Sequence, residues 1–249
     1  NGDFFLVGGC TTGGSTRFCV SRFKQNGDAD AAFGSNGFVV TPVLGNRDIA
    51  RSAAIQTSNK ILVTGSCLIG VTNRFCTARY LENGSLDSSF GDQGLVVTSI
   101  WVNDEANSMT VQPDGKILVA GTCHSGATHR ACAIRYLADG SVDEGFATNG
   151  KFLGDRTDQF VRAVAVQVDG KVILAGHCVS TGFCVARLQS SGLIDTTFAN
   201  DGLAMTKVSG AVSIGTSIAI QNDGKLVVAG QCTDHGANVF SMCLVRYTA

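Results

Sequence analysis

The chain has 249 residues, of which 44% are hydrophobic and 31 are glycine. This length and composition are typical of a globular protein that buries a large core. With 19 Lys and Arg against 20 Asp and Glu, the formal net charge is −1, which draws the chain neither to nucleic acid nor to anionic lipid. No stretch approaches the roughly 20 apolar residues that span a bilayer. We therefore expect no nucleic-acid partner and no membrane insertion.

A glycine- and cysteine-containing segment recurs along the chain at a nearly constant interval. The copies are DFFLVGGC, NKILVTGSC, GKILVAGTC, GKVILAGHC and GKLVVAGQC, and alignment on Gly9, Gly65, Gly121, Gly176 and Gly230 gives intervals of 56, 56, 55 and 54 residues. Such a period indicates one repeated supersecondary unit. We expect one domain, residues 1–249, with units near 1–49, 50–105, 106–160, 161–213 and 214–249.

Each unit is predicted to contain four short antiparallel strands. In the fourth unit the first strand is AVAVQ (163–167), an Asp-Gly turn follows, and the second strand is KVILAGH (171–177). A third strand ends in C-x-x-R, and a long turn precedes a fourth strand such as LVVT (95–98). We expect type I′ turns at Asp114-Gly115, Asp169-Gly170 and Asp223-Gly224. No helical periodicity is present, so the pattern predicts an all-β fold, a β-propeller of about five blades.

The strings QPDGKILVAG, IRY and DGSVDEGFATNG resemble the delta-60 repeat of large secreted or surface bacterial proteins. The resemblance covers nearly the whole chain, as four full periods and a fifth hairpin. It implies a β-propeller and an extracellular location, secreted or at the cell surface, and it implies nothing about an activity. The cysteines are an addition to that resemblance.

Ten cysteines occur as one pair per unit, at the end of the second strand and inside the third. Opposed residues on adjacent antiparallel strands are close enough for a disulfide. We predict five intrablade disulfides, which indicate an oxidising compartment. The pairs are Cys10 with Cys19, Cys67 with Cys76, Cys123 with Cys132, Cys178 with Cys184, and Cys232 with Cys243.

The segment CHSGATHRAC (123–132) raises the alternative of a zinc site, because it offers two cysteines and two histidines. The same cysteine positions recur in four other units without a histidine pair. We therefore interpret the cysteines as disulfide partners and His124 and His129 as exposed loop residues. Five similar hairpins also provide no distinctive environment for a redox pair. We expect no metal and no cofactor.

An arginine precedes an aspartate by eight residues in successive units, as in Arg79 and Asp87. Arg135 with Asp143 and Arg187 with Asp195 repeat the spacing, which predicts a structural ion pair in each blade. A phenylalanine three residues after the aspartate is expected to lie between blades. These residues are Phe33, Phe90, Phe146 and Phe198.

Two loop sets differ between units, namely the loops from second to third strand and those from fourth to first strand. In an up-and-down blade they emerge on the same face, and variable loops usually carry specificity. We expect a glycan or protein partner at this face, and a role as a binding or structural module. Trp101 lies beside acidic residues, a combination common in sugar sites, but it can equally pack under its own loop. The candidate ligand-binding residues are Trp101, Asp104, Arg130, His124, His129, Asp48 and Asp158.

Asp48, Asp104 and Asp158 lie eight, eight and nine residues before a glutamine that ends a first strand. If those strands line the axis, three carboxylates gather near a central channel. The alternative function is therefore a propeller-type glycoside hydrolase. A catalytic pair requires two dissimilar environments, whereas these positions recur. We interpret them as strand caps or as a cation or water site, and we expect no enzyme.

The terminal units are incomplete, because the first lacks its first strand and the last lacks its fourth. Two arrangements remain open: a five-bladed ring with two thin blades, or a segment of a longer array. The second leaves unpaired strand edges that another subunit or more chain would cover. Self-assembly through the terminal blades, as in a surface filament, is therefore a further expectation.

Overall fold

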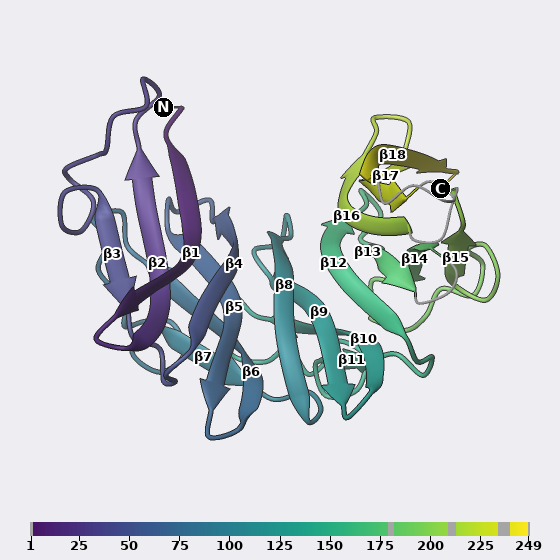
Figure 1. The fold of residues 1–249 in the computed structure, drawn as a ribbon, viewed down its shortest axis with the longest axis horizontal. Helices are drawn as coiled ribbons and strands as arrows, with labels where there is room; N and C mark the ends of the chain where they lie inside the picture. The colour runs from purple at the N-terminus through teal and green to yellow at the C-terminus, as the bar shows by residue number, and fades with distance from the viewer. Residues whose placement is uncertain (1, 179–181, 209–212, 234–239, 249) are drawn as a thin grey trace. The chain divides into compact units, whose positions relative to one another are not determined.

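The computed structural model describes residues 2–178, 182–208, 213–233 and 240–248. These residues form five antiparallel sheets and no helix (Figure 1). In this part of the chain, no helix is present that could cross a membrane. The predicted all-β fold of repeated antiparallel units is confirmed.

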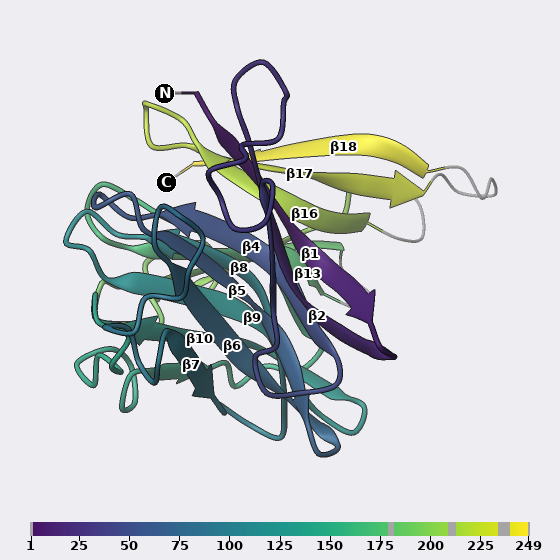
Figure 2. The ribbon, with the colours of Figure 1, turned by 90° about the vertical axis from the view of Figure 1, so that its left-hand side faces the viewer.

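The strands fall into five blades in chain order. Blade 1 has strand order β1-β2-β3, blades 2 to 4 have four strands each, and blade 5 has order β16-β17-β18 (Figure 2). The first strands of blades 2 to 5 begin one to three residues before the expected unit boundaries. The bounds are β1 (Phe4–Thr12), β2 (Ser15–Phe23), β3 (Phe38–Thr41), β4 (Asp48–Ile55), β5 (Ile61–Ile69), β6 (Thr72–Tyr80), β7 (Leu95–Thr98), β8 (Asn103–Val111), β9 (Ile117–Ser125), β10 (Thr128–Tyr136), β11 (Lys151–Leu153), β12 (Gln159–Val166), β13 (Val172–Cys178), β14 (Gly182–Leu188), β15 (Leu203–Thr206), β16 (Ser213–Ile220), β17 (Leu226–Thr233) and β18 (Phe240–Tyr247).

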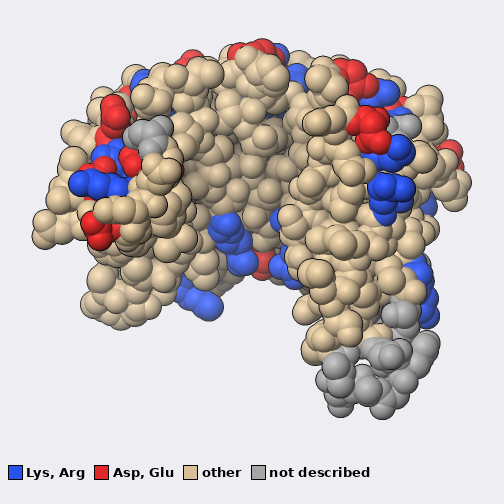
Figure 3. Space-filling view, turned by 90° about the horizontal axis from the view of Figure 1, so that it is seen from above, with Lys and Arg blue, Asp and Glu red and all other residues tan. Residues whose placement is uncertain are grey.

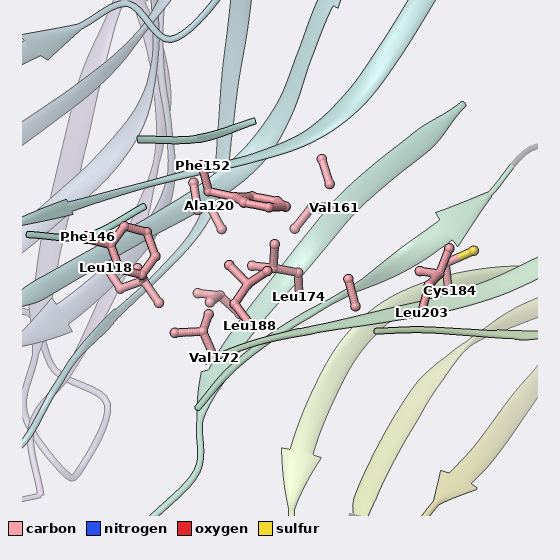
Figure 4. Close-up of a cluster of buried hydrophobic side chains, with 14 of the residues drawn as sticks. Leu118, Ala120, Phe146, Phe152, Val161, Val172, Leu174, Cys184, Leu188 and Leu203 are labelled. Carbon is pink, nitrogen blue, oxygen red and sulfur yellow. The ribbon is translucent and has the colours of Figure 1, made fainter. Parts of the chain in front are cut away.

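The chain forms two compact units, and the boundary between them passes through blade 3. Unit 1 comprises residues 1–117 and 136–141, and unit 2 comprises 118–135 and 142–249. The core of unit 1 contains Phe18 and Tyr80, both fully buried. In unit 2, side chains of β9, β12, β13 and β14 meet in a cluster that includes Leu118, Val161 and Leu174 (Figure 4). Each unit therefore has an apolar core of its own.

The turns between first and second strands differ from the expected type I′. At Asp114-Gly115 the amide of Gly115 donates to the carbonyl of Gln112 at 2.9 Å, and the amide of Gln112 donates to the carbonyl of Lys116 at 2.8 Å. Gly115 has a φ of 83°, and Asp114 is not among the described residues with positive φ. Pro113 sets a negative φ at the first central position, so the loop is a type I turn followed by a left-handed residue. The Asp-Gly signal thus predicted the hairpin correctly and its turn type wrongly.

Strand register also corrects the alignment of the first repeat. Gly8 lies opposite Cys19, as Gly65 lies opposite Cys76, so Gly8 and not Gly9 is the equivalent glycine. The glycine is required because the first strand bulges toward it: a Cβ at Gly65 would lie 1.9 Å from a carbonyl oxygen of β4. The same close approach occurs in blades 4 and 5.

All five predicted disulfides are present, with Cα–Cα distances of 5.7 to 6.0 Å. The paired cysteines are diagonal neighbours rather than opposed, because Cys10 lies opposite Arg17 and Cys19 opposite Gly8. In blades 1 to 3 the strands continue past the cysteines to two-residue turns, so the expected variable loops are β-hairpin extensions there. The matching loops of blades 4 and 5 fall partly outside the described residues.

The predicted arginine–aspartate pair is confirmed. Nε of Arg79 lies 2.8 Å from Oδ2 of Asp87, and the guanidinium covers the fully buried ring of Phe90. Burial alone would raise the pKa of the Asp87 carboxyl, but hydrogen bonds from Lys60 and Ser89 and the charge of Arg79 hold it below its usual value. Equivalent pairs join Arg22 to Asp30, Arg135 to Asp143 and Arg187 to Asp195.

The same arginine connects its blade to the next. Arg22 donates to the carbonyl of Glu82 at 2.6 Å, Arg135 to that of Ser190 at 2.7 Å, and Arg79 to that of Ala138. Beside each arginine a backbone amide makes a second bond to the next blade. In these bonds the amide of Gly34 donates to the carbonyl of Asn83 (2.8 Å), that of Gly91 to the carbonyl of Asp139 (2.8 Å) and that of Ala147 to the carbonyl of Ser191 (2.7 Å). We call the buried arginine, its aspartate and phenylalanine partners and these two bonds to the next blade the blade joint.

The phenylalanine of each blade joint lies against a glycine of the next blade, as expected for a residue between blades. A Cβ on Gly140 would come within 2.8 Å of the Phe90 ring, and one on Gly192 within 2.7 Å of the Phe146 ring. Both glycines have positive φ, so no other residue would fit the turn or the space. Glycine at this turn is therefore part of the blade joint.

We predict that Arg79→Met lowers the free energy of unfolding by about 2 kcal/mol, because it removes a buried charged hydrogen bond to Asp87 and leaves Lys60 as the one cation, among the described residues, paired with that carboxylate. Urea denaturation measures this change. The control is Arg51→Met, since Arg51 pairs with Glu105 at 3.8 Å with both side chains about one-third exposed. That control should cost less than about 1 kcal/mol. Equal losses in the two variants would contradict a structural role for the buried pair.

We also predict that the double variant Cys123→Ala, Cys132→Ala is less stable by roughly 2 to 3 kcal/mol, because the disulfide closes a loop of about ten residues in the unfolded chain. Denaturation without reductant measures the difference, and adding reductant should narrow it. Unchanged stability in the double variant would show that the bond does not form in solution.

Candidate binding site

Four aromatic rings of unit 2 lie in a row, which we call the ring row. His124 on β9 and His129 on β10 have ring centroids 5.3 Å apart, and His129 lies 4.5 Å from Phe160 on β12. Phe160 and His177 on β13 follow at 4.6 Å with an interplanar angle of 4°. All four side chains are half-buried. The ring row therefore presents aromatic surface from blades 3 and 4 to solvent.

Strand pairing creates the ring row. Phe160 lies directly opposite His177 in the antiparallel register of β12 and β13, so the two rings stack as a cross-strand pair. His129 lies on the β10 side of the two-residue turn Gly126-Ala127, and its Nδ1 donates to the Ala127 carbonyl at 3.0 Å. This bond leaves Nε2 of His129 as the acceptor nitrogen.

His177 is neutral at physiological pH. Burial and, to a smaller extent, the nearby charge of Arg162 together lower the pKa of its imidazole to about 4. Its Nδ1 is buried and has no hydrogen-bond partner among the described residues. Because this nitrogen is buried, a ligand on the surface would contact the face of the His177 ring and not its Nδ1.

The ring row is a surface rather than a pocket. The cavity beside it, lined by Leu174, Phe160 and His177 among others, has a volume of only about 10 Å³. That volume is about the minimum that one water molecule needs. A ligand would therefore lie across the rings and would not be enclosed by them.

The positions of His124 and His129 correct the sequence interpretation, which treated them as exposed loop residues. Both lie within strands, because β9 and β10 extend beyond the cysteines, and stacking leaves their rings half-buried. Arg130 follows on β10 and is also half-buried. Phe160 and His177 were missed. One signal existed for His177: it occupies the middle of GHC, where the other repeats have Gly, Ser, Thr or Gln.

Asp48 and Asp104 act as caps on the loops that precede β4 and β8. The Asp48 carboxylate accepts the amides of Val43 and Gly45, each at 3.0 Å. The Asp104 carboxylate accepts those of Ile100 at 2.8 Å and Trp101 at 3.0 Å. Both aspartates are 0% exposed, and each uses its two oxygens to fix the backbone of the loop before its strand. This is the strand-cap interpretation of these positions.

Asp158 is not equivalent to Asp48 and Asp104, which corrects the proposed set of three carboxylates. Asp48 lies opposite Cys67, and in blade 4 it is Gln159 that lies opposite Cys178. Asp158 is one residue earlier, exposed, with a φ of 61°. The nine-residue spacing of Asp158, against eight for the other two, marked this offset.

Trp101 lies half-buried in the loop between β7 and β8 of unit 1. Its carbonyl accepts the hydroxyl of Ser99 at 3.0 Å, and its amide binds Asp104. Arg74 on β6 braces the same loop by donating to the Val102 carbonyl at 2.8 Å. The candidate residues are therefore divided, with Asp48, Trp101 and Asp104 in unit 1 and the others in unit 2.

The segment CHSGATHRAC (123–132) does not provide the ligands of a zinc site. Cys123 and Cys132 are joined to each other, so neither is available as a thiolate ligand. Throughout the described ranges, no three His, Cys, Asp or Glu side chains form a group that could hold a metal ion.

Five regions of the chain match one family model, described as a domain of unknown function (DUF5122) β-propeller. The regions are residues 6–33, 56–90, 112–146, 167–198 and 221–249. Together with the five sheets, this match confirms the predicted β-propeller; the narrower resemblance to the delta-60 repeat stays a prediction.

A curated relative and several solved structures are similar to the chain. Outer membrane protein B of Rickettsia typhi (strain ATCC VR-144 / Wilmington) is 30% identical over 211 residues, which span 82% of this chain and 11% of that protein. A gluconolactonase of Xanthomonas campestris, XC5397, is 14% identical with a TM-score of 0.49, covering 86% of this chain and 65% of its own. The GH43 endo-arabinanase of Bacillus licheniformis is 13% identical with a TM-score of 0.44, covering 99% and 90%.

We predict that stability falls as the pH is lowered through the range from 6.5 to 4. His177 takes up a proton near pH 6.5 when unfolded and only near pH 4 when folded, so the unfolded state binds more protons between these values. Because the ring is partly solvated, we expect a loss of about 1 kcal/mol. Urea denaturation at pH 7 and 4.5 measures it, and His177→Phe should remove that part of the loss. An unaltered pH dependence in the variant would refute the assignment.

Proposed function

Since the chain belongs to the DUF5122 β-propeller family, we propose that it is an extracellular interaction module that binds a glycan across the ring row of blades 3 and 4. The observation that carries the proposal is the row of four half-buried rings on adjacent strands. The apolar C–H faces of sugar rings stack on such aromatic surfaces, and the ring nitrogens supply hydrogen bonds to hydroxyl groups.

A neutral, extended ligand fits this surface best. The view in Figure 3 shows charged side chains only in small separate groups, and the net charge of the chain is −1. On this face a polyanion would find no broad basic field. The cavity of about 10 Å³ beside the ring row is too small for a sugar, which also favours a chain of several sugar units lying across the surface over an enclosed small molecule.

An extracellular location is part of the proposal. Five disulfides in a chain of 249 residues are typical of proteins that fold in an oxidising compartment. The relative in Rickettsia typhi is named as an outer membrane protein, which agrees with a role at a cell surface. Both observations support an exposed module rather than an intracellular one.

We favour binding over hydrolysis. Of the three carboxylates that were hydrolase candidates, those of Asp48 and Asp104 are fully buried and accept loop amides with both oxygens, so only that of Asp158 is exposed. A glycosidase requires two carboxyl groups that reach the glycosidic bond from opposite sides. Neither of these two side chains reaches the surface.

We predict that a glycan array will show saturable binding to the wild-type chain and no turnover of the bound glycan. Phe160→Ala and His129→Ala should each weaken binding about tenfold, because each removes a stacking surface worth about 1.4 kcal/mol. Phe240→Ala is the matched control, since Phe240 is an exposed phenylalanine of blade 5 outside the ring row, and it should bind like wild type.

Two outcomes would overturn the proposal. One is the absence of any glycan ligand on the array, with capture of a protein partner instead. The other is equal weakening by Phe240→Ala and Phe160→Ala. Melting temperatures of the variants show whether each is folded at the assay temperature.

A further inference from the structure

The hairpin of β5 and β6 carries an exposed apolar tip. It extends beyond both neighbouring strands of blade 2, because pairing with β4 ends at Cys67 and pairing with β7 ends at Phe75 (Figure 1). At its turn the side chain of Val71 is 90% exposed. Four aliphatic side chains at this end are each more than one-third exposed, and we call them the blade 2 tip: Ile69, Val71, Leu44 in the loop before β4 and Val102 in the loop before β8.

Hydrogen bonds hold these two loops against the hairpin. The amide of Leu68 donates to the carbonyl of Arg47 at 3.1 Å, and the amide of Asn73 donates to Oδ1 of Asn103 at 2.9 Å. All of these residues belong to unit 1. Strands β1 and β2 pack on one side of blade 2 and β8 packs on the other. The blade 2 tip therefore lies between two blades, and neither end of the chain creates it.

The other hairpins show that the fold does not require apolar residues at this turn. Blades 1 and 3 have a two-residue turn at the same place, with small or polar residues at the matching positions. These are Gly14 and Ala127 where blade 2 has Val71, and Thr12 and Ser125 where it has Ile69. Aliphatic side chains that the hairpin does not need, gathered on one exposed end, indicate contact with an apolar environment outside the chain.

The charge beside the blade 2 tip is positive. The three segments that form it, residues 43–48, 68–74 and 99–104, contain two arginines and two aspartates. Both aspartates are the buried caps of β4 and β8, with 0% exposure. Arg47 is exposed, and within the described residues its hydrogen bonds come from its backbone and not from its guanidinium. The net charge of −1 for the whole chain hides this local separation.

We propose that the blade 2 tip docks on the surface of a bilayer that contains anionic lipid. Aliphatic side chains on a projecting turn enter the boundary between headgroups and acyl chains, and an arginine beside them meets the lipid phosphates. Trp101, half-buried in the loop next to Val102, is of a residue type enriched at that boundary. The chain lies on the membrane and does not cross it.

A protein partner fits this surface less well. A standard protein interface buries about 800 Å² on each partner, over about 20 to 30 residues. The blade 2 tip offers four aliphatic side chains on a projecting end, which a bilayer can accept without a complementary shape. The inference does not rest on the ring row, which belongs to unit 2.

The test is co-sedimentation of the whole chain with vesicles of equal parts phosphatidylcholine and phosphatidylglycerol. We expect the wild type to sediment with these vesicles, and more weakly with vesicles of phosphatidylcholine alone. Val71→Asp should lower the partition coefficient about tenfold, because it replaces an apolar contact with a charge. The matched control is Val168→Asp, since Val168 is a fully exposed valine at a turn of unit 2. It should sediment like the wild type.

A second variant tests the charge. Arg47→Ala should weaken binding to the anionic vesicles about fivefold and leave the binding to phosphatidylcholine vesicles unchanged. Trp101 provides an independent readout, because it is the only tryptophan of the chain and lies beside the blade 2 tip. Anionic vesicles should shift its emission to shorter wavelength in the wild type and in Val168→Asp, but not in Val71→Asp.

Four results would each overturn the proposal. They are no sedimentation of the wild type with anionic vesicles, equal sedimentation of Val71→Asp and Val168→Asp, unchanged binding of Arg47→Ala to anionic vesicles, and unchanged Trp101 emission when vesicles are bound. Light scattering identifies the main rival: self-association that Val71→Asp abolishes, without vesicle binding, would assign the blade 2 tip to a protein contact.

Discussion

The blade joint is the interaction on which the rest of this structure depends. A buried guanidinium lies over a phenylalanine ring, pairs with an aspartate of its own blade and donates to a carbonyl of the next, as Arg79 does with Phe90, Asp87 and Ala138. Removing an arginine and an aspartate from water is costly, and the cost is offset only when most donors and acceptors find partners. The planar fork of arginine can do this for two blades at once, which lysine cannot.

The blade joint also explains why the repeat has a fixed period. The arginine, the aspartate eight residues later, the phenylalanine three residues after that and the glycine of the next blade must keep their spacing for the contacts to form. The second-to-third strand hairpins carry no such constraint beyond their disulfide. Residues on these hairpins can therefore vary between blades, and the ring row arises where two adjacent blades carry rings that meet.

Much of the fold could be predicted from the sequence because its signals are local and recur in three to five of the units. The Asp-Gly hairpins, the cysteine pairs and the arginine–aspartate spacing each involve residues close together in the chain. The turn type was wrong because the loop has three residues and not two, and Asp158 was misassigned because a one-residue offset exchanges the capping position with Gln159. Successive side chains of a strand point to opposite faces of the sheet, so an offset of one residue places a side chain on the other face.

The ring row could not be predicted, because it depends on contacts between blades. His129 meets Phe160 across strands that belong to different blades, and their sequence separation gives no hint of the approach.

Hydrogen exchange at single amides tests the blade joint most directly. The amides of Gly34, Gly91 and Ala147 each donate to the next blade, whereas Ala199, the equivalent residue of blade 4, is exposed and no such bond is found for it within the described residues. We predict that the amides of Gly34, Gly91 and Ala147 exchange as slowly as amides in the central strands, and that the amide of Ala199 exchanges rapidly. Equally rapid exchange at all four positions would contradict the central role of the blade joint.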